Sequence, residues 1–287
     1  MRPVNKSKMM VRRWLPTVIA VAVILLAAFG LLRLLLRAGA RSETPAEPTS
    51  APEIAATPTP APTPEPVAKS LKDYARAHNL QLSVWPQELQ ELFEKNPDAR
   101  RFVQEYPEKK DLDPVIDLTA EAKQGEIPAL YQWDDRWGYR RYIGNFLGLS
   151  GCAPTSMSMA IIGLTGNADA DPWTLAQYAE ENGHYEPGNG TSWSFITSVG
   201  PLYGVEVREI GLDQNLLDSE LRAGHVVCCC VGPGDFTEYG HYFLIVGVED
   251  GLYRIHDPNS VTNTNKLWEY DRLAKQTLCL WSLQAAN

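Results

Sequence analysis

Cys152 is the side chain of this 287-residue sequence with the clearest potential for nucleophilic chemistry. It lies in Gly151-Cys152-Ala153-Pro154, ahead of apolar residues at helical spacing, and Gly166 ends that run. Because proline suits the first turn of a helix, we expect Cys152 at or just before a helix N-terminus. There the unpaired N–H groups and the helix dipole stabilise a thiolate and can donate to an oxyanion. A buried, inert cysteine at a helix start would give the same pattern.

A β-hairpin is predicted closer to the C-terminus. Residues 240–248 form an apolar run typical of a strand, residues 249–251 are the turn sequence Glu-Asp-Gly, and residues 252–256 return as a second strand. A histidine lies at the start of the first strand, and an aspartate directly follows the second strand. The two strands of the hairpin could therefore bring an imidazole and a carboxylate together, which is the arrangement of a general base.

Local geometry brings that histidine, His241, close to Asp257. A three-residue turn places His241 opposite Asn259, whereas a two-residue turn at Glu249-Asp250 places it opposite Pro258. With either turn, Asp257 lies within two residues of the position that faces His241. A carboxylate beside an imidazole holds its tautomer and stabilises the imidazolium, so His241 is the predicted base and Asp257 its partner.

The other four histidines are weaker candidates for the base. His256 and Asp257 are neighbours on a strand and should point to opposite faces. His225 begins another apolar strand and has no nearby acid, while His78 and His184 lie in polar segments. The sequence therefore favours position 241.

The five cysteines indicate neither a metal site nor a disulfide framework. Five is an odd number, so at least one cysteine cannot pair within the chain, and none has CxxC spacing. Cys228, Cys229 and Cys230 lie in an apolar run. We interpret them as small residues of a buried strand, with a disulfide or redox role as the alternative. We predict no metal and no cofactor.

Composition favours a folded body of acidic character. Hydrophobic residues make up 44% of the chain and charged residues 21%, which is enough apolar material for a core. Residues 1–41 carry eight Lys or Arg and no acid, which leaves 18 basic and 35 acidic residues, a net charge of −17, for residues 42–287. Such a field argues against nucleic acid as a partner and favours neutral or basic substrates.

Residues 1–41 predict a cytoplasmic tail followed by a transmembrane anchor. Residues 14–36 would span about 35 Å as a helix, enough to cross a bilayer. More positive charge precedes this segment than follows it, so the N-terminus should stay in the cytoplasm. The prediction is a single-pass cell-membrane protein whose catalytic domain is extracytoplasmic. A cleaved signal peptide is the alternative, since Ala38-Gly39-Ala40 fits a cleavage pattern.

Two segments separate this anchor from Cys152. Residues 42–66 hold eight prolines and predict an extended linker. Residues 67–126 predict a helical arm with two amphipathic helices, the first starting near Pro86 and the second ended by Pro107, with a break at Asn96-Pro97. These helices either cover the catalytic domain or obstruct its groove as a prosegment does.

Residues 127–287 resemble the C-thirty-nine-like peptidases, a family of papain-fold cysteine peptidases. The resemblance rests on spaced motifs in the expected order: LYQWDDRWG at 130–138, GCAPTSMSM at 151–159, GNGTSW at 188–193, PGDFT at 233–237, GHYF at 240–243 and DPN at 257–259. It implies an α+β, papain-like fold in which an N-terminal catalytic helix packs on an antiparallel sheet, preceded here by the transmembrane helix and the linker.

The resemblance also implies roles for four residues. Cys152 would be the nucleophile, His241 the general base, and Asp257 the residue that orients the base. The side chain of Gln132 would help to form the oxyanion hole. The sequence departs from the family at Ala153, where glycine usually follows the cysteine, and the interval between Gln132 and the cysteine is longer than in papain.

The predicted reaction is hydrolysis of peptide bonds through a thioester on the cysteine. The predicted partners are a peptide or peptidoglycan-stem substrate and, through the N-terminal helix, the membrane, with no nucleic acid. Two other functions would use the same residues. A transglutaminase-like acyltransferase would let an amine capture the thioester, and a non-catalytic module would bind peptides or cell wall without cleaving them.

Overall fold

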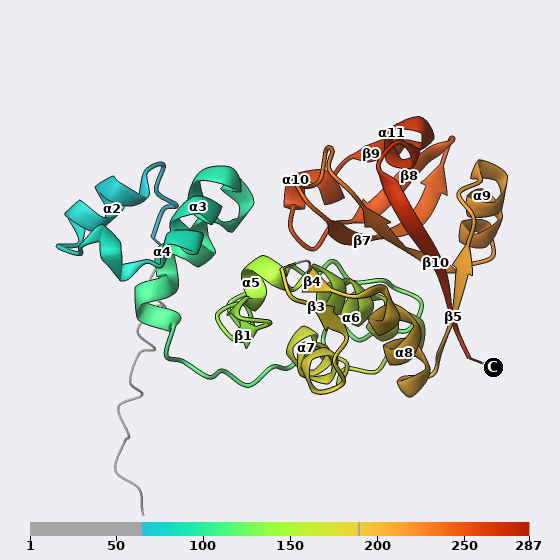
Figure 1. The fold of residues 1–287 in the computed structure, drawn as a ribbon, viewed down its shortest axis with the longest axis horizontal. Helices are drawn as coiled ribbons and strands as arrows, with labels where there is room; N and C mark the ends of the chain where they lie inside the picture. The colour runs from blue at the N-terminus through green and yellow to red at the C-terminus, as the bar shows by residue number, and fades with distance from the viewer. Residues whose placement is uncertain (1–64, 189, 287) are drawn as a thin grey trace, which may run out of the picture. The chain divides into compact units, whose positions relative to one another are not determined.

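A computed structural model describes residues 65–188 and 190–286, which all belong to one compact unit (Figure 1). Its helices are α2 (Leu71–Ala77), α3 (Gln87–Lys95), α4 (Arg100–Lys109), α5 (Leu147–Ser150), α6 (Cys152–Thr165), α7 (Pro172–Glu181), α8 (Trp193–Leu202), α9 (Gln214–Arg222), α10 (Val261–Thr264) and α11 (Tyr270–Ala274). Two short 3-10 helices, η1 (Leu82–Val84) and η2 (Pro97–Ala99), lie among the first three.

A six-stranded antiparallel sheet dominates the C-terminal half of the described residues, in the order β5-β10-β6-β7-β8-β9. Its strands are β5 (Val205–Ile210), β6 (Val226–Val231), β7 (His241–Glu249), β8 (Leu252–His256), β9 (Leu267–Glu269) and β10 (Thr277–Ala285). Two small pairs add β1 (Arg141–Tyr142) with β2 (Asn145–Phe146), and β3 (Tyr185–Glu186) with β4 (Gly190–Thr191). The predicted α+β class with an antiparallel sheet is confirmed.

The large sheet separates two hydrophobic cores, because side chains alternate between the faces of a strand. On β6, Cys228 and Cys230 belong to the core that contains α6, α7 and α8. Cys229 belongs to the opposite core, beneath α9 and α11 (Figure 1). These three cysteines are buried and free, so the interpretation as a buried strand is confirmed.

The arm, residues 67–126, has a core of its own that continues onto the following region. Its first predicted helix begins where expected, with Pro86 as the N-cap of α3, and η2 occupies the predicted break. Phe102 of α4 stacks on Tyr139 with ring centroids 4.2 Å apart. The Tyr139 hydroxyl donates to the Phe102 carbonyl at 2.7 Å, so the arm is anchored beside the segment that carries Gln132.

The predicted end of the second arm helix at Pro107 is wrong, since α4 continues to Lys109. Proline has no N–H for the carbonyl of Val103, four residues earlier, and such a loss normally disrupts a helix. Here the indole N–H of Trp85 donates to the Val103 carbonyl at 2.7 Å. A tertiary hydrogen bond therefore satisfies the carbonyl that proline leaves free.

The β7–β8 hairpin has a different turn from either predicted one. Asp250-Gly251 connects the strands, with φ of 49° and 78°. Positive φ at both residues is the type I′ geometry that matches the twist of paired strands. A bulge after Ile245 then shifts the register by one residue. The shift restores the alignment of His241 with position 259 that the three-residue turn had predicted.

No helix within residues 65–188 and 190–286 is long and apolar enough to cross a membrane. The predicted anchor at 14–36 lies outside the described residues, and so do residues 42–64 of the predicted linker. Anchor and linker therefore stay predictions.

Candidate active site

Cys152 is the first residue of α6, as the sequence predicted, and Gly166 caps the other end with φ 74°. The first turn of α6 has no side-chain cap, so the N–H groups of Cys152 and Ala153 remain available at the positive end of the helix. Cys152 is partly exposed, whereas the other four cysteines are buried. Among the cysteines it therefore has the environment of a reactive thiol.

Helix α6 is joined to strand β7 close to Cys152. Ser156 lies one turn after Cys152 on the same face of the helix, and its hydroxyl donates to the Tyr242 carbonyl at 3.3 Å. His241 directly precedes Tyr242 and is the first residue of β7. The start of the helix and the start of the strand therefore lie side by side, which brings Cys152 close to His241.

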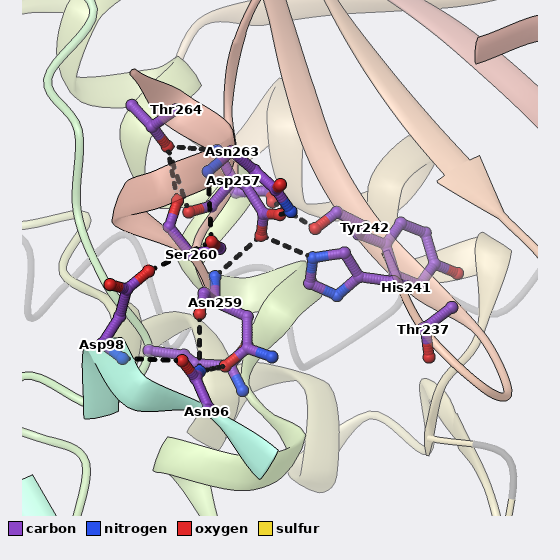
Figure 2. A network of polar contacts seen from close by, with 12 residues as sticks. Asn96, Asp98, Thr237, His241, Tyr242, Asp257, Asn259, Ser260, Asn263 and Thr264 are labelled. Atoms are coloured by element: carbon purple, nitrogen blue, oxygen red, sulfur yellow. Dashed lines mark hydrogen bonds and ion pairs between the residues drawn. The ribbon is translucent and has the colours of Figure 1, made fainter. Parts of the chain in front are cut away.

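His241 and Asp257 form a buried pair (Figure 2). His241 Nε2 lies 2.7 Å from Asp257 Oδ1, and the two side chains are only 6% and 1% exposed. Because the carboxylate accepts the Nε2 proton, Nδ1 is left as the basic nitrogen. His256, as predicted, takes no part in this pair: its Nδ1 lies 3.1 Å from the Pro128 carbonyl.

The Asp257 carboxylate is held by two further donors (Figure 2). Its Oδ1 also accepts the backbone N–H of Asn259 at 2.9 Å, and its Oδ2 accepts Nδ2 of Asn263 at 2.8 Å. Three donors satisfy the buried carboxylate as an anion. Nothing in the sequence indicates this role of Asn263, because only the turn of α10 brings its side chain back to Asp257.

Charge coupling dominates the ionisation of this pair. Burial by itself would lower the pKa of His241, but the Asp257 carboxylate and the neighbouring Cys152 side chain outweigh burial and raise that pKa above its ordinary value of 6.5. Burial would likewise raise the pKa of Asp257, and the His241 charge together with the hydrogen bonds lowers it below 3.8. The pair therefore favours an imidazolium beside a carboxylate.

Gln132 is buried between Asp257 and the start of α6. Its backbone N–H donates to the Pro258 carbonyl at 2.8 Å, and its Nε2 donates to the Gly148 carbonyl at 3.0 Å. Gly148 belongs to α5, the short helix directly before α6. One N–H of the amide remains for a further acceptor. Within the described residues, the buried Oε1 has no hydrogen-bond partner.

The expectation that His225 has no nearby acid is wrong. Its Nδ1 lies 2.8 Å from Oε2 of Glu220, which the turn after α9 brings back toward it. That carboxylate also accepts hydrogen bonds from Ser282 Oγ at 2.5 Å and Arg208 Nη2 at 2.6 Å. The chain therefore has a second buried carboxylate that binds a histidine.

The geometry around Cys152 suits proton transfer and acyl transfer. An imidazole oriented by a buried carboxylate can take the proton of a nearby thiol and later return it to a leaving group. The uncapped first turn of α6 offers amide donors for an oxyanion. Among residues 65–188 and 190–286, no group of three His, Cys, Asp or Glu side chains could hold a metal ion.

Comparison with known proteins gives one matching family model and weak likenesses to solved structures, among them two peptidase chains. A family model described as the Peptidase_C39 like family matches residues 124–284, more than half of the chain. The peptidase domain of Streptococcus ComA, a bi-functional ABC transporter involved in a quorum sensing pathway, is 19% identical, with a TM-score of 0.35 over 48% of this chain and 93% of that one. A putative C39-like peptidase from Bacillus anthracis is 14% identical, with a TM-score of 0.36 over 57% and 97%. No curated protein matches the chain.

Proposed function

The chain belongs to the Peptidase_C39 like family, and from this premise we propose that it is a membrane-anchored, extracytoplasmic cysteine peptidase with a papain-like fold. The observation that carries the proposal is the buried pair in which His241 Nε2 lies 2.7 Å from Asp257 Oδ1, at the strand end that adjoins the start of α6. These contacts support a site in which Cys152 is the nucleophile, His241 its base and Asp257 the partner of that base.

In the proposed reaction, His241 Nδ1 takes the proton of the Cys152 thiol, and the thiolate attacks a peptide carbonyl. The tetrahedral oxyanion accepts hydrogen bonds from the amides of the first turn of α6 and from the remaining N–H of Gln132. The imidazolium then gives its proton to the leaving amine, and the acyl group stays on sulfur as a thioester. Water, deprotonated by the imidazole, hydrolyses the thioester and restores the thiol. These steps use no metal and no cofactor.

The role of Asp257 follows from its charge and its burial. As an anion it stabilises the imidazolium that forms in both halves of the reaction, and its bond to Nε2 keeps Nδ1 as the basic nitrogen. The substrate class we propose is a peptide, including the stem peptides of peptidoglycan. The basic N-terminal segment and residues 14–36 support an anchored, outward-facing enzyme.

The decisive experiment removes the sulfur. The full-length chain and its Cys152→Ala variant are incubated with a denatured protein and, separately, with peptidoglycan stem peptides, and new N-termini are measured by mass spectrometry. We expect cleavage by the parent protein and none by the variant. Cys279→Ala, which removes a buried thiol on β10, is the matched control and should cleave as the parent does. Equal cleavage by Cys152→Ala and the parent would overturn the assignment.

The same assay separates the rival functions. Adding a primary amine in excess would divert the thioester of a transferase, so amide products with the parent protein would indicate an acyltransferase. Peptide binding without any new N-termini, combined with a Cys152 thiol inert to iodoacetamide at neutral pH, would indicate a binding module. We expect rapid alkylation at Cys152 and slow alkylation at the four buried cysteines.

A further inference from the structure

We propose that Asn96 and Asp98, in the arm, are positioning residues for the proposed catalytic pair, and that they act by holding the segment that carries Asp257. This inference rests on the proposed function and adds to it a role for a part of the chain outside the matched residues 124–284. The segment concerned comprises residues 257–264, which link β8 to α10 and include that short helix. We call it the Asp257 segment.

Asn96 contacts the Asp257 segment directly (Figure 2). Its Nδ2 donates to the Asn259 carbonyl at 2.8 Å and lies 3.1 Å from Asn259 Oδ1. Its Oδ1 accepts the backbone N–H of Asp98 at 3.0 Å, which fixes the orientation of the amide. Both polar atoms of the Asn96 side chain are therefore hydrogen-bonded, and its Nδ2 holds the Asn259 carbonyl.

Asn259 also binds the proposed catalytic carboxylate, through its N–H. The Asn259 N–H donates to Asp257 Oδ1 at 2.9 Å, the same oxygen that lies 2.7 Å from His241 Nε2. A short chain of hydrogen bonds therefore leads from Asn96 through Asn259 to Asp257 and the imidazole. The Asn259 carbonyl additionally accepts the indole N–H of Trp133 at 3.3 Å, so it also joins the segment of Gln132.

Asp98 holds the other end of the Asp257 segment. Its Oδ2 accepts Ser260 Oγ at 3.1 Å and the backbone N–H of Thr262 at 3.0 Å, and its Oδ1 lies 3.4 Å from Thr262 Oγ1. Ser260 is the N-cap of α10, so the Asp98 carboxylate adds a negative charge and an acceptor at the first turn of that helix. This turn presents Asn263 to Asp257 Oδ2.

The arm is itself anchored firmly enough to act as a support. Phe102 lies so close to Gly138 and Gly148 that an added Cβ would come within 2.7 and 2.8 Å of its ring. The Gly148 carbonyl accepts a hydrogen bond from Gln132, the proposed oxyanion-hole residue. Through Phe102 the arm therefore also packs beside the residue that binds Gln132. In the part of the chain that the structure describes, no hydrogen bond or ion pair joins the arm to Cys152 or His241. The contacts favour a brace over an obstructing prosegment.

The test uses the full-length chain and needs no known substrate. Cys152 is alkylated with iodoacetate and with iodoacetamide across a pH series, and the ratio of the two rates is followed by mass spectrometry. An imidazolium beside the sulfur attracts the anionic reagent, so the ratio falls as His241 loses its proton. The titratable groups that act on His241 are Asp257 and Cys152. His241→Gln should abolish the pH dependence of the ratio.

For Asn96→Ala and Asp98→Asn we expect the midpoint of that fall to move toward pH 6.5 by about half a unit or more, because a looser carboxylate stabilises the imidazolium less. We also expect cleavage in the mass-spectrometric assay to drop about fivefold, the effect of one lost hydrogen bond. Asp98→Glu, which keeps the charge, should recover part of both effects.

Gln90→Ala is the matched control. The Gln90 amide donates to the Leu82 and Trp85 carbonyls at 3.2 and 2.8 Å, so its loss weakens the arm without touching the Asp257 segment. A midpoint shifted equally by Gln90→Ala and Asn96→Ala, or by neither, would overturn the inference. If the parent protein itself shows a ratio independent of pH, the proposed Cys152–His241 pair fails instead. Should Asn96→Ala not fold, Asp98→Asn by itself decides the outcome.

Discussion

Two pairs of a histidine with a buried carboxylate lie near opposite ends of strand β6. His241 pairs with Val231 at the end of the strand and contacts Asp257, whereas His225 directly precedes the strand and contacts Glu220. The distance along β6 between these positions is roughly 20 Å. The two N···O distances, 2.7 and 2.8 Å, are almost equal, so the pair alone does not distinguish a catalytic site from a structural one.

The surroundings of the two carboxylates differ. Asp257 has no cationic side chain other than His241 among its hydrogen-bond partners in the described residues, and its other donors are neutral amides. Glu220 also binds Arg208 and accepts a hydrogen bond from the Ser282 hydroxyl. That hydroxyl therefore bonds to the acid and not chiefly to the imidazole, and Arg208 already neutralises the acid. Of these two pairs, the one at the His241 end is therefore the better candidate for a base beside a nucleophile.

The largest effect should come from removing each imidazole in turn. His241→Gln should lower peptide cleavage by at least about 100-fold, because it removes the general base. His225→Gln should leave cleavage within about twofold, since it acts only on a distant structural cluster. The mass-spectrometric cleavage assay measures both. A loss with His225→Gln that matches the loss with His241→Gln would remove the distinction between the two pairs.

Removing each negative charge should give the next largest difference. Asp257→Asn should lower cleavage about tenfold to 100-fold, since the imidazolium loses its anion but its Nε2–H keeps an acceptor. Glu220→Gln should leave cleavage nearly unchanged, as measured in the same assay on folded protein. A larger loss with Glu220→Gln than with Asp257→Asn would place the active pair at the other end of β6.

The pH dependence of stability should separate the pairs further. The raised pKa of His241 contributes stability below its ordinary 6.5 that is lost as the pH rises, and the lowered pKa of Asp257 contributes stability above 3.8 that is lost as the pH falls. The destabilisation by Asp257→Asn should therefore be largest between these values, about 2 kcal/mol near pH 5, and smaller near pH 9. Urea unfolding at both pH values measures it.

Glu220 should behave differently in the same experiment. Burial would raise its pKa, but hydrogen bonds from its three partners lower that pKa to about 2. Its contribution is complete above the ordinary 4.5 and disappears as the pH falls toward 2. The destabilisation by Glu220→Gln should hence be the same at pH 5 and pH 9. A destabilisation that is equally large at pH 5 and pH 3 would contradict the assignment of a lowered pKa.

The smallest effect is expected from Ser282→Ala. Glu220 keeps Arg208 and His225 as donors, so the free energy of unfolding should fall by less than about 1 kcal/mol. Cleavage and alkylation of Cys152 should not change. Abolished cleavage in this variant would mean that Ser282 acts as a nucleophile beside His225.

Local patterns predicted the elements of the candidate site well. Helix α6 begins at Cys152 and ends before Gly166, and the hairpin that presents His241 forms where the Glu-Asp-Gly turn indicated. These features depend on neighbours within a few residues, whose propensities are visible in the sequence. Two details failed. The helix end at Pro107 was changed by one tertiary hydrogen bond, and the turn is the two-residue Asp250-Gly251 turn, whose effect on the register the bulge after Ile245 reverses.

Contacts between distant segments could not be predicted in this way. Glu220 reaches His225 only because the chain turns back after α9, and Asn96 meets Asn259 across 163 positions. A polar side chain in an amphipathic arm has the same sequence signature whether it faces water or another loop. Only the packing of the arm beside Tyr139 determines which polar residues face the Asp257 segment.

The sequence by itself determined the helix that starts at Cys152, the hairpin that brings His241 near Asp257, and the family to which the chain belongs, because each follows from short-range patterns or matched motifs. The tertiary structure decided that Asp257 has His241 as its one cationic partner in the described residues, whereas Glu220 binds both His225 and Arg208. It also decided that the arm supports the Asp257 segment. These outcomes depend on which side chains are buried together, and burial is a property of the whole fold.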